Sequence, residues 1–119
     1  MKTTDRVFAW ILVLGGLLHG VGSYLGYRKE PMTLLWALCA TLLTLLLAAI
    51  NLLRAGRRGD PALAWICFAG NLAWAVTAFT FSALIGNIFD VRGSIHGITA
   101  LVLAGFSLNS ATSRGEPAS

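Results

Sequence analysis

Four long apolar stretches occupy almost the whole chain, and the charged residues lie almost entirely in the gaps between them. The stretches cover about residues 7–27, 32–53, 62–85 and 91–111. Because a helix rises about 1.5 Å per residue, roughly 20 apolar residues cross the hydrocarbon core of a bilayer. The pattern therefore predicts an all-α, polytopic integral membrane protein, built as an antiparallel four-helix transmembrane bundle.

The composition agrees with lipid, rather than water, as the surroundings of this chain. Only 12% of its 119 residues are charged, whereas a soluble domain carries about 25%. We expect a single domain over residues 1–111 and a disordered cytoplasmic tail over residues 112–119, which is too polar to bury anything. The net charge of +4 does not indicate nucleic-acid binding, because the basic residues lie at the ends of the stretches and form no stripe. Membrane lipid is the expected partner.

Local signals set the boundaries of the four helices. Asp60 followed by Pro61 is typical of a helix start, and Pro31 begins the second stretch in the same way. The fourth stretch is the weakest, and it reaches membrane length only if it runs over residues 91–111, with a re-entrant segment as the alternative. For the first stretch, the alternative to a retained helix is a cleaved signal peptide.

The positive charges indicate the orientation. Four helices place both ends of the chain and the loop between the second and third helices on one side of the membrane. That side carries six positive charges and the other carries three; they are Lys2, Arg6, Arg54, Arg57, Arg58 and Arg114 against Arg28, Lys29 and Arg92. The positive-inside rule then predicts a multi-pass protein of the inner (plasma) membrane with both termini in the cytoplasm.

Small residues mark the expected contact faces, because helices in lipid associate by close packing. The glycines expected to pack against neighbouring helices are Gly15, Gly16, Gly20, Gly22, Gly26, Gly93 and Gly97. The same faces could join two copies of the chain, or this chain and a larger membrane protein. Polar side chains should turn to the interior, since an unpaired amide in hydrocarbon is costly. The expected interior polar residues are Thr41, Thr44, Asn51, Asn71 and Trp74.

Two histidines, His19 and His96, are the only imidazoles in the chain. His19 lies about 12 Å, and His96 about 6 to 9 Å, inside the non-cytoplasmic ends of their helices. The first and last helices of a four-helix bundle are normally neighbours, so the two rings should share one leaflet and could face each other. Ionisable residues inside a membrane point to function by default.

Several ligands fit a pair of imidazoles. A b-type haem would use His19 and His96 as axial ligands, with neighbouring glycines giving the porphyrin room. A lipid or quinone headgroup, or another small solute, would use the same pair with Tyr24, Trp36 and Ser94 at the rim. Structural zinc takes four ligands, of which the pair supplies two. The alternative to all three is two histidines that only hydrogen-bond within the bundle.

The sequence argues against catalysis. No Ser or Cys stands with a His and an orienting carboxylate at a recognisable spacing. No stretch contains a carboxylate, so proton-coupled export through a membrane-embedded Glu is not expected. The leading expectation is a small non-enzymatic membrane protein, an accessory or interaction subunit that packs through its glycine-rich faces and requires no cofactor. Haem binding is the first alternative, and binding or transport of a lipid, quinone or small solute is the second.

Overall fold

The computed structural model describes residues 2–113. Over these residues the chain forms four α-helices: α1 (Lys2–Tyr27), α2 (Pro31–Gly56), α3 (Pro61–Leu84) and α4 (Val91–Thr112). The predicted all-α class is confirmed, and each helix is long and apolar enough to cross a membrane. Helix α4 is uninterrupted over 22 residues, so it shows no break of the kind a re-entrant segment needs. Thr112 of the predicted tail ends α4, and residues 114–119 lie outside the described residues.

The helix starts follow from local hydrogen bonding. The Asp60 side chain accepts a hydrogen bond from the Leu63 backbone N–H at 3.0 Å, and Pro61 occupies the first helical position of α3. Asp90 caps α4 in a similar way, accepting from the Arg92 N–H at 3.0 Å. Each cap satisfies a backbone donor that has no partner within its helix.

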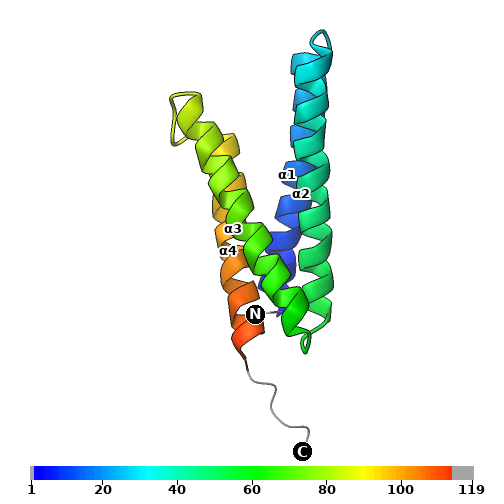
Figure 1. Cartoon of the computed structure of the whole chain (residues 1–119), viewed down its shortest axis with the longest axis vertical. Coiled ribbons are helices and arrows are strands. Elements are labelled where there is room, and N and C mark those ends of the chain that lie inside the picture. The colour runs from blue at the N-terminus through cyan, green and yellow to red at the C-terminus, as the bar shows by residue number, and fades with distance from the viewer. Residues whose placement is uncertain (1, 114–119) are drawn as a thin grey trace, which may run out of the picture.

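The helices form two hairpins that meet at one end of the molecule only. α1 packs closely along α2, and α3 packs closely along α4, whereas contacts between the hairpins are fewer. Figure 1 shows the hairpins touching near the α2–α3 loop and diverging towards the α1–α2 and α3–α4 loops. The N-terminus, the end of α4 and the α2–α3 loop lie together at the closed end. The fold is therefore compatible with a four-helix bundle, but one that is splayed at its other end.

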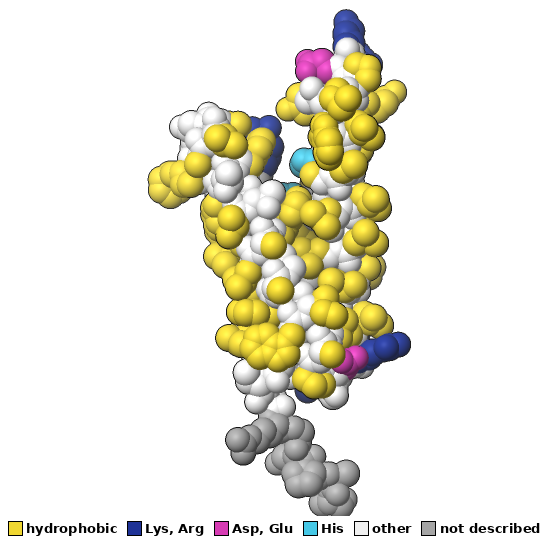
Figure 2. Space-filling model, in the orientation of Figure 1, with side chains coloured by type: hydrophobic (Ala, Val, Ile, Leu, Met, Phe, Trp, Pro, Cys, Tyr) yellow, Lys and Arg dark blue, Asp and Glu magenta, His cyan; other side chains and the backbone are white. Residues whose placement is uncertain are grey.

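The outer surface is apolar. Large apolar side chains, most of them leucine, are exposed on all four helices, and hydrophobic atoms dominate the face drawn in Figure 2. The buried core instead consists largely of small residues, among them Ala9, Ala48 and Ala100. Cys39 is exposed on this apolar surface and Cys67 is buried. Small residues inside and large apolar residues outside are the arrangement expected where the solvent is lipid.

Five of the predicted packing glycines lie at helix contacts. A β-carbon at Gly16 would meet the Leu45 side chain of α2, and one at Gly20 would meet the Thr41 side chain of α2. A β-carbon at Gly15 would meet the His96 ring of α4. On α4, a β-carbon at Gly93 would collide with the Ser82 side chain of α3, and one at Gly97 would collide with the Phe79 ring of α3. Absence of a side chain lets each pair of backbones approach closely.

Gly22 and Gly26 do not pack against another helix of this chain, contrary to the prediction. Nothing lies within 4 Å of a β-carbon built at either position. Both are near the C-terminal end of α1 (Lys2–Tyr27), and Figure 1 shows the hairpins diverging towards the α1–α2 loop that follows it. Packing within the chain fails for these two residues because splaying is a long-range property that helical spacing does not report, and their packing against a second copy or a larger partner stays a prediction.

Candidate functional site

The two histidines lie side by side where the hairpins begin to diverge. The ring centroids of His19 on α1 and His96 on α4 are 6.2 Å apart, and the ring planes are inclined by 81°. The Nδ1 atom of His19 lies 2.8 Å from the Thr41 hydroxyl of α2. The Trp74 indole N–H of α3 donates to Nδ1 of His96 over 3.4 Å. All four helices thus contribute one side chain to a single polar cluster, which we call the histidine cluster (His19, Thr41, Trp74, His96).

The hydrogen bonds of the histidine cluster assign the ring protons. The Thr41 hydroxyl donates to the Ala37 carbonyl at 3.2 Å, so His19 donates from Nδ1 to Thr41 and keeps a lone pair on Nε2. His96 accepts at Nδ1 from Trp74, so its proton is on Nε2 when the ring is neutral. The unprotonated Nε2 of His19 is therefore an unused acceptor in the cluster.

Glycines in α1 make room for the histidine cluster. The His96 ring occupies the space that a side chain at Gly15 would fill, since its Cε1 atom would lie 3.1 Å from a β-carbon there. Thr41 fills the space next to Gly20, with its methyl carbon 2.9 Å from a β-carbon at that position. A larger residue at Gly15 would push α4 away from α1, and one at Gly20 would push α2 away. The two glycines therefore let His96 and Thr41 approach α1 closely enough to join the cluster.

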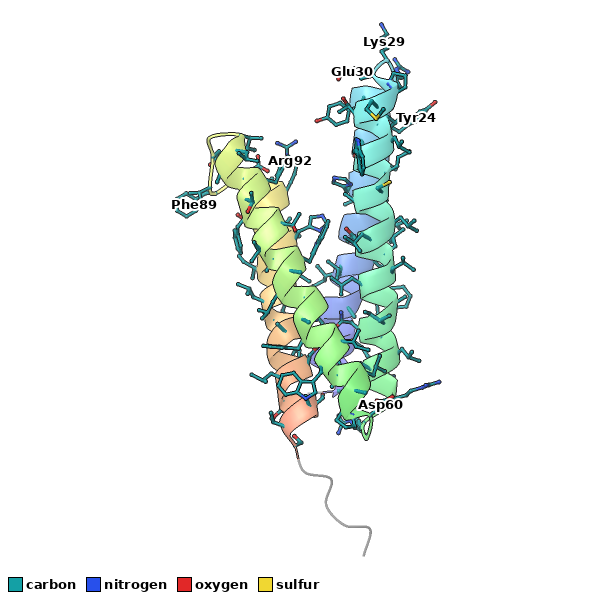
Figure 3. The ribbon with its side chains drawn as sticks, viewed as in Figure 1. Tyr24, Lys29, Glu30, Asp60, Phe89 and Arg92 are labelled. Atoms are coloured by element: carbon teal, nitrogen blue, oxygen red, sulfur yellow. The ribbon has the colours of Figure 1, made fainter. Side chains whose placement is uncertain are left out.

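Above the histidine cluster the hairpins enclose an open space, which we call the cleft. Figure 2 shows it as a notch between the hairpins, with a histidine at its lower edge and basic atoms on one flank. Gly22 and Gly26 follow Gly15 by 7 and 11 residues, so they lie on the same face of α1 and form one wall. Arg92 precedes His96 by one helical turn and forms part of the opposite wall, projecting towards the α1–α2 hairpin (Figure 3).

Arg92 and Asp90 form an ion pair at the rim of the cleft. Nε and Nη2 of Arg92 donate to the two carboxylate oxygens of Asp90 at 3.0 and 3.1 Å. These hydrogen bonds hold the pKa of the Asp90 carboxyl below its usual value, so the carboxylate stays ionised and paired. The guanidinium also lies over the Phe81 ring, 5.3 Å from its centroid. Within residues 2–113, Nη1 of Arg92 has no hydrogen-bond partner.

An apolar groove on the surface borders the histidine cluster at Trp74. It runs between α2 and α3 and has a volume of about 260 Å³. Apolar side chains dominate its lining, which consists of Leu43, Leu46, Leu47, Ile50, Ile66, Gly70, Ala73, Trp74 and Thr77. Trp74 belongs to both places, because its ring borders the groove and its N–H reaches His96.

The structure does not gather the predicted rim residues around the histidines. Tyr24 is 56% exposed and points away from the α3–α4 hairpin in Figure 3. Trp36 is 67% exposed on α2. Ser94 lies two residues from His96, about 200° around α4, so it faces another direction. Residue depth led to their selection, but depth carries no information on which way a side chain points.

A second polar cluster closes the opposite end of the molecule, and four of its six members were missed. Asn51 and Asn71 exchange amide hydrogen bonds of 3.0 Å in both directions, and Asn71 also donates to Ser107. Arg54 forms an ion pair of 2.6 Å with Asp5 and donates to Ser110. We call this set the closing cluster (Asp5, Asn51, Arg54, Asn71, Ser107, Ser110).

The four predicted stretches contain no carboxylate, but α1 begins at Lys2, five residues before the first stretch, so Asp5 belongs to its first turn and is buried. Likewise Arg54, assigned to a loop by its charge, is a fully buried residue of α2. The sequence did contain one indication that Arg54 faces the interior. Arg54 follows Asn51 by three residues, so it lies on the same helix face as the small and polar residues Thr44, Ala48 and Asn51. Thr44 and Asn51 of that stripe are themselves fully buried, and Thr41 is half-buried.

The donor set of the histidine cluster does not suit a metal ion or a haem. Within residues 2–113, no group of three or more His, Cys, Asp or Glu side chains is placed to hold a metal. A porphyrin between the imidazoles would have to separate His96 from α1, because the ring already lies against the backbone at Gly15. The cluster suits hydrogen bonding to an organic headgroup better.

The chain matches no protein-family model, no curated protein and no solved structure in the comparisons made. Its function is therefore argued from the geometry of the histidine cluster, the cleft and the groove.

Proposed function

We propose that this protein is a non-enzymatic integral membrane protein that binds a lipid- or quinone-like amphiphile between its two hairpins. The polar headgroup would lie in the cleft on the histidine cluster, and the apolar tail would lie in the groove between α2 and α3. The observation that carries the proposal is that the groove and the histidine cluster share Trp74, which lines the groove and donates its indole N–H to His96.

The chemistry of the site supports an amphiphile over a fully polar solute. The groove supplies apolar surface along residues 43–50 of α2 and 66–77 of α3, whereas the cleft supplies one unused acceptor on His19 and one cation on Arg92. Ligand sites are typically apolar, with a few polar groups that fix the orientation of the ligand. A molecule with a small polar head and a hydrocarbon tail matches that distribution.

Insertion in the inner (plasma) membrane, with both termini in the cytoplasm, is part of the proposal. The apolar exterior and four helices of membrane length support it. The charge bias also supports this orientation. Arg54 pairs with Asp5 inside the protein and Arg92 pairs with Asp90, which leaves five other positive charges on the proposed cytoplasmic side and two on the other.

Filling the cleft tests amphiphile binding. Gly22→Leu places a side chain in open space, so it should leave the fold intact and reduce binding at least tenfold by occlusion. The matched control is Gly105→Leu, because nothing lies within 4 Å of a β-carbon at this exposed position of α4 either. Native mass spectrometry of the detergent-purified protein, titrated with decylubiquinone or palmitate, measures the bound fraction.

The control variant should bind like the parent protein, and a His19→Ala variant should bind less. If neither probe binds the parent protein, or if the Gly22→Leu and Gly105→Leu variants bind equally, the proposed site is wrong. Tyr24→Phe serves as a second control, because Tyr24 points away from the cleft.

An accessory-subunit function is the second proposal, and the open faces of Gly22 and Gly26 favour it. These glycines are four residues apart and present bare backbone, which is the geometry that lets a helix of a second copy or of a larger membrane protein approach. The mass of the complex in mild detergent separates the two proposals. A strictly monomeric, partnerless protein rules out the accessory function and leaves amphiphile binding in place.

A further inference from the structure

The charged residues of the cleft are distributed unevenly. The acidic residues in the described part of the chain are Asp5, Glu30, Asp60 and Asp90. Asp5 is buried in the closing cluster, Asp60 lies in the α2–α3 loop and Glu30 lies at the tip of the α1–α2 hairpin (Figure 3). Asp90, at the rim, is held by Arg92. Glu30 projects on the cleft side of that tip (Figure 3), where it accepts a hydrogen bond from the Thr33 hydroxyl at 3.1 Å. Next to the histidines, the described part of the chain therefore borders the cleft with one guanidinium and two imidazoles, and Asp90 is the carboxylate nearest to them.

Arg92 retains capacity for another anion. Its side chain is 66% exposed, and only Nε and Nη2 are used in the pair with Asp90. A guanidinium carries five N–H donors in a planar fork that matches carboxylate and phosphate oxygens. Arg92 stands one turn above His96 on the same face of α4. A headgroup that reaches His19 therefore passes close to this guanidinium.

We infer that the amphiphile carries a monoanionic headgroup, a carboxylate or a phosphate diester, which the Arg92 guanidinium binds in the cleft. This inference rests on the proposed function and names its ligand class. Asp90 then acts as an internal competitor, because its carboxylate already occupies two donors of the guanidinium that the ligand needs.

Pairs of probes with the same tail isolate the headgroup charge. Palmitate and hexadecanol differ in their headgroup and hardly in their tail, and phosphatidylglycerol and phosphatidylcholine differ in net charge. We expect the parent protein to bind the anionic member of at least one pair about two- to fivefold more tightly, the range of one partly exposed charge contact. Discrimination in the first pair identifies a carboxylate ligand, and discrimination in the second identifies a phosphate diester.

Two substitutions at the rim should act in opposite directions. Arg92→Gln should bring the affinity ratio within each pair close to one. Asp90→Asn keeps a good helix cap and frees the guanidinium, so it should strengthen binding of the anion but not of the neutral probe. Arg28→Gln removes an exposed cation from the tip of the other hairpin and should change neither affinity.

The outcomes separate this inference from the proposed function. If the parent protein binds both members of each pair equally, or if Asp90→Asn weakens anion binding, the anionic headgroup is overturned while amphiphile binding stands. If no probe binds, or if Gly22→Leu has no effect on binding, the proposed function itself fails.

Discussion

At the scale of single residues, the ion pair of Asp5 and Arg54 is the most consequential contact in the structure. The Arg54 side chain is 1% exposed, and two of its nitrogens donate to Asp5 at 2.6 and 3.0 Å. Its Nε atom is buried without a partner. Removing one member of a buried ion pair leaves the other charge without compensation, at a typical cost of about 3–5 kcal/mol.

Asp5→Ala should therefore lower the free energy of unfolding by about 3–5 kcal/mol, measured by titrating the detergent-solubilised protein with denaturing detergent. The double variant Asp5→Ala with Arg54→Met should be less destabilised than Asp5→Ala alone, because it leaves no unpaired charge. Arg57→Met, an exposed cation three residues further on, is the control and should change little. Equal effects of Asp5→Ala and Arg57→Met would show that the pair contributes nothing.

At the scale of helices, the α3–α4 hairpin depends on the absence of side chains along one face of α4. A β-carbon at Gly93 would come within 2.9 Å of the Ala78 backbone carbonyl and collide with Ser82. A backbone atom cannot rotate away as a side chain can. The two helices would have to separate locally, which also exposes polar groups to lipid.

We expect Gly93→Ala to destabilise the protein by about 1–3 kcal/mol, the usual cost of overpacking. Gly105→Ala in the same helix should be neutral or slightly stabilising, because its position is open and Ala has the higher helix propensity. The same denaturation assay compares the two variants. A Gly93→Ala variant as stable as Gly105→Ala would mean that α3 and α4 are not packed as closely as described.

At the scale of the whole molecule, the two ends of the protein differ. The closing cluster ties all four helices together at the end that carries the termini. At the other end, the hairpins separate above the histidine cluster. The cleft therefore opens towards the side that we propose to be non-cytoplasmic.

Cysteine labelling in intact cells tests this orientation. In a background with Cys39→Ala and Cys67→Ala, a cysteine replacing Lys29 should react with a membrane-impermeant maleimide, whereas one replacing Arg58 should react only after permeabilisation. The reverse pattern would invert the proposed topology. Reaction of both positions in intact cells would remove the four-span insertion altogether.

The extent to which the sequence predicted the structure depends on the range of each interaction. Asp60 located the start of α3 because a cap bonds within its own first turn. The nearness of His19 and His96 followed from their depths and from the neighbourhood of α1 and α4, although a role for the pair in binding stays a prediction. Asp5 and Arg54 are 49 residues apart, and hydropathy alone places both charges outside the membrane.

Gly22, Gly26 and the rim residues failed for a related reason. The angle between two hairpins is set by the sum of many contacts, so no local spacing reports it. Gly15 and Gly22 share one face of α1, yet one contacts His96 and the other contacts nothing. Only the three-dimensional arrangement distinguishes a glycine that packs from one that lines an opening.

The unequal lengths of the helices have a consequence for the surrounding bilayer. Helices α1 and α2 each have 26 residues, or about 39 Å of helix, against a hydrocarbon thickness of about 30 Å. Helix α4 has 22 residues, or about 33 Å, and is close to a match. In a flat bilayer the longer hairpin must therefore tilt or stand clear of the acyl chains, which carries Arg28 and Lys29 out to the level of the phosphates.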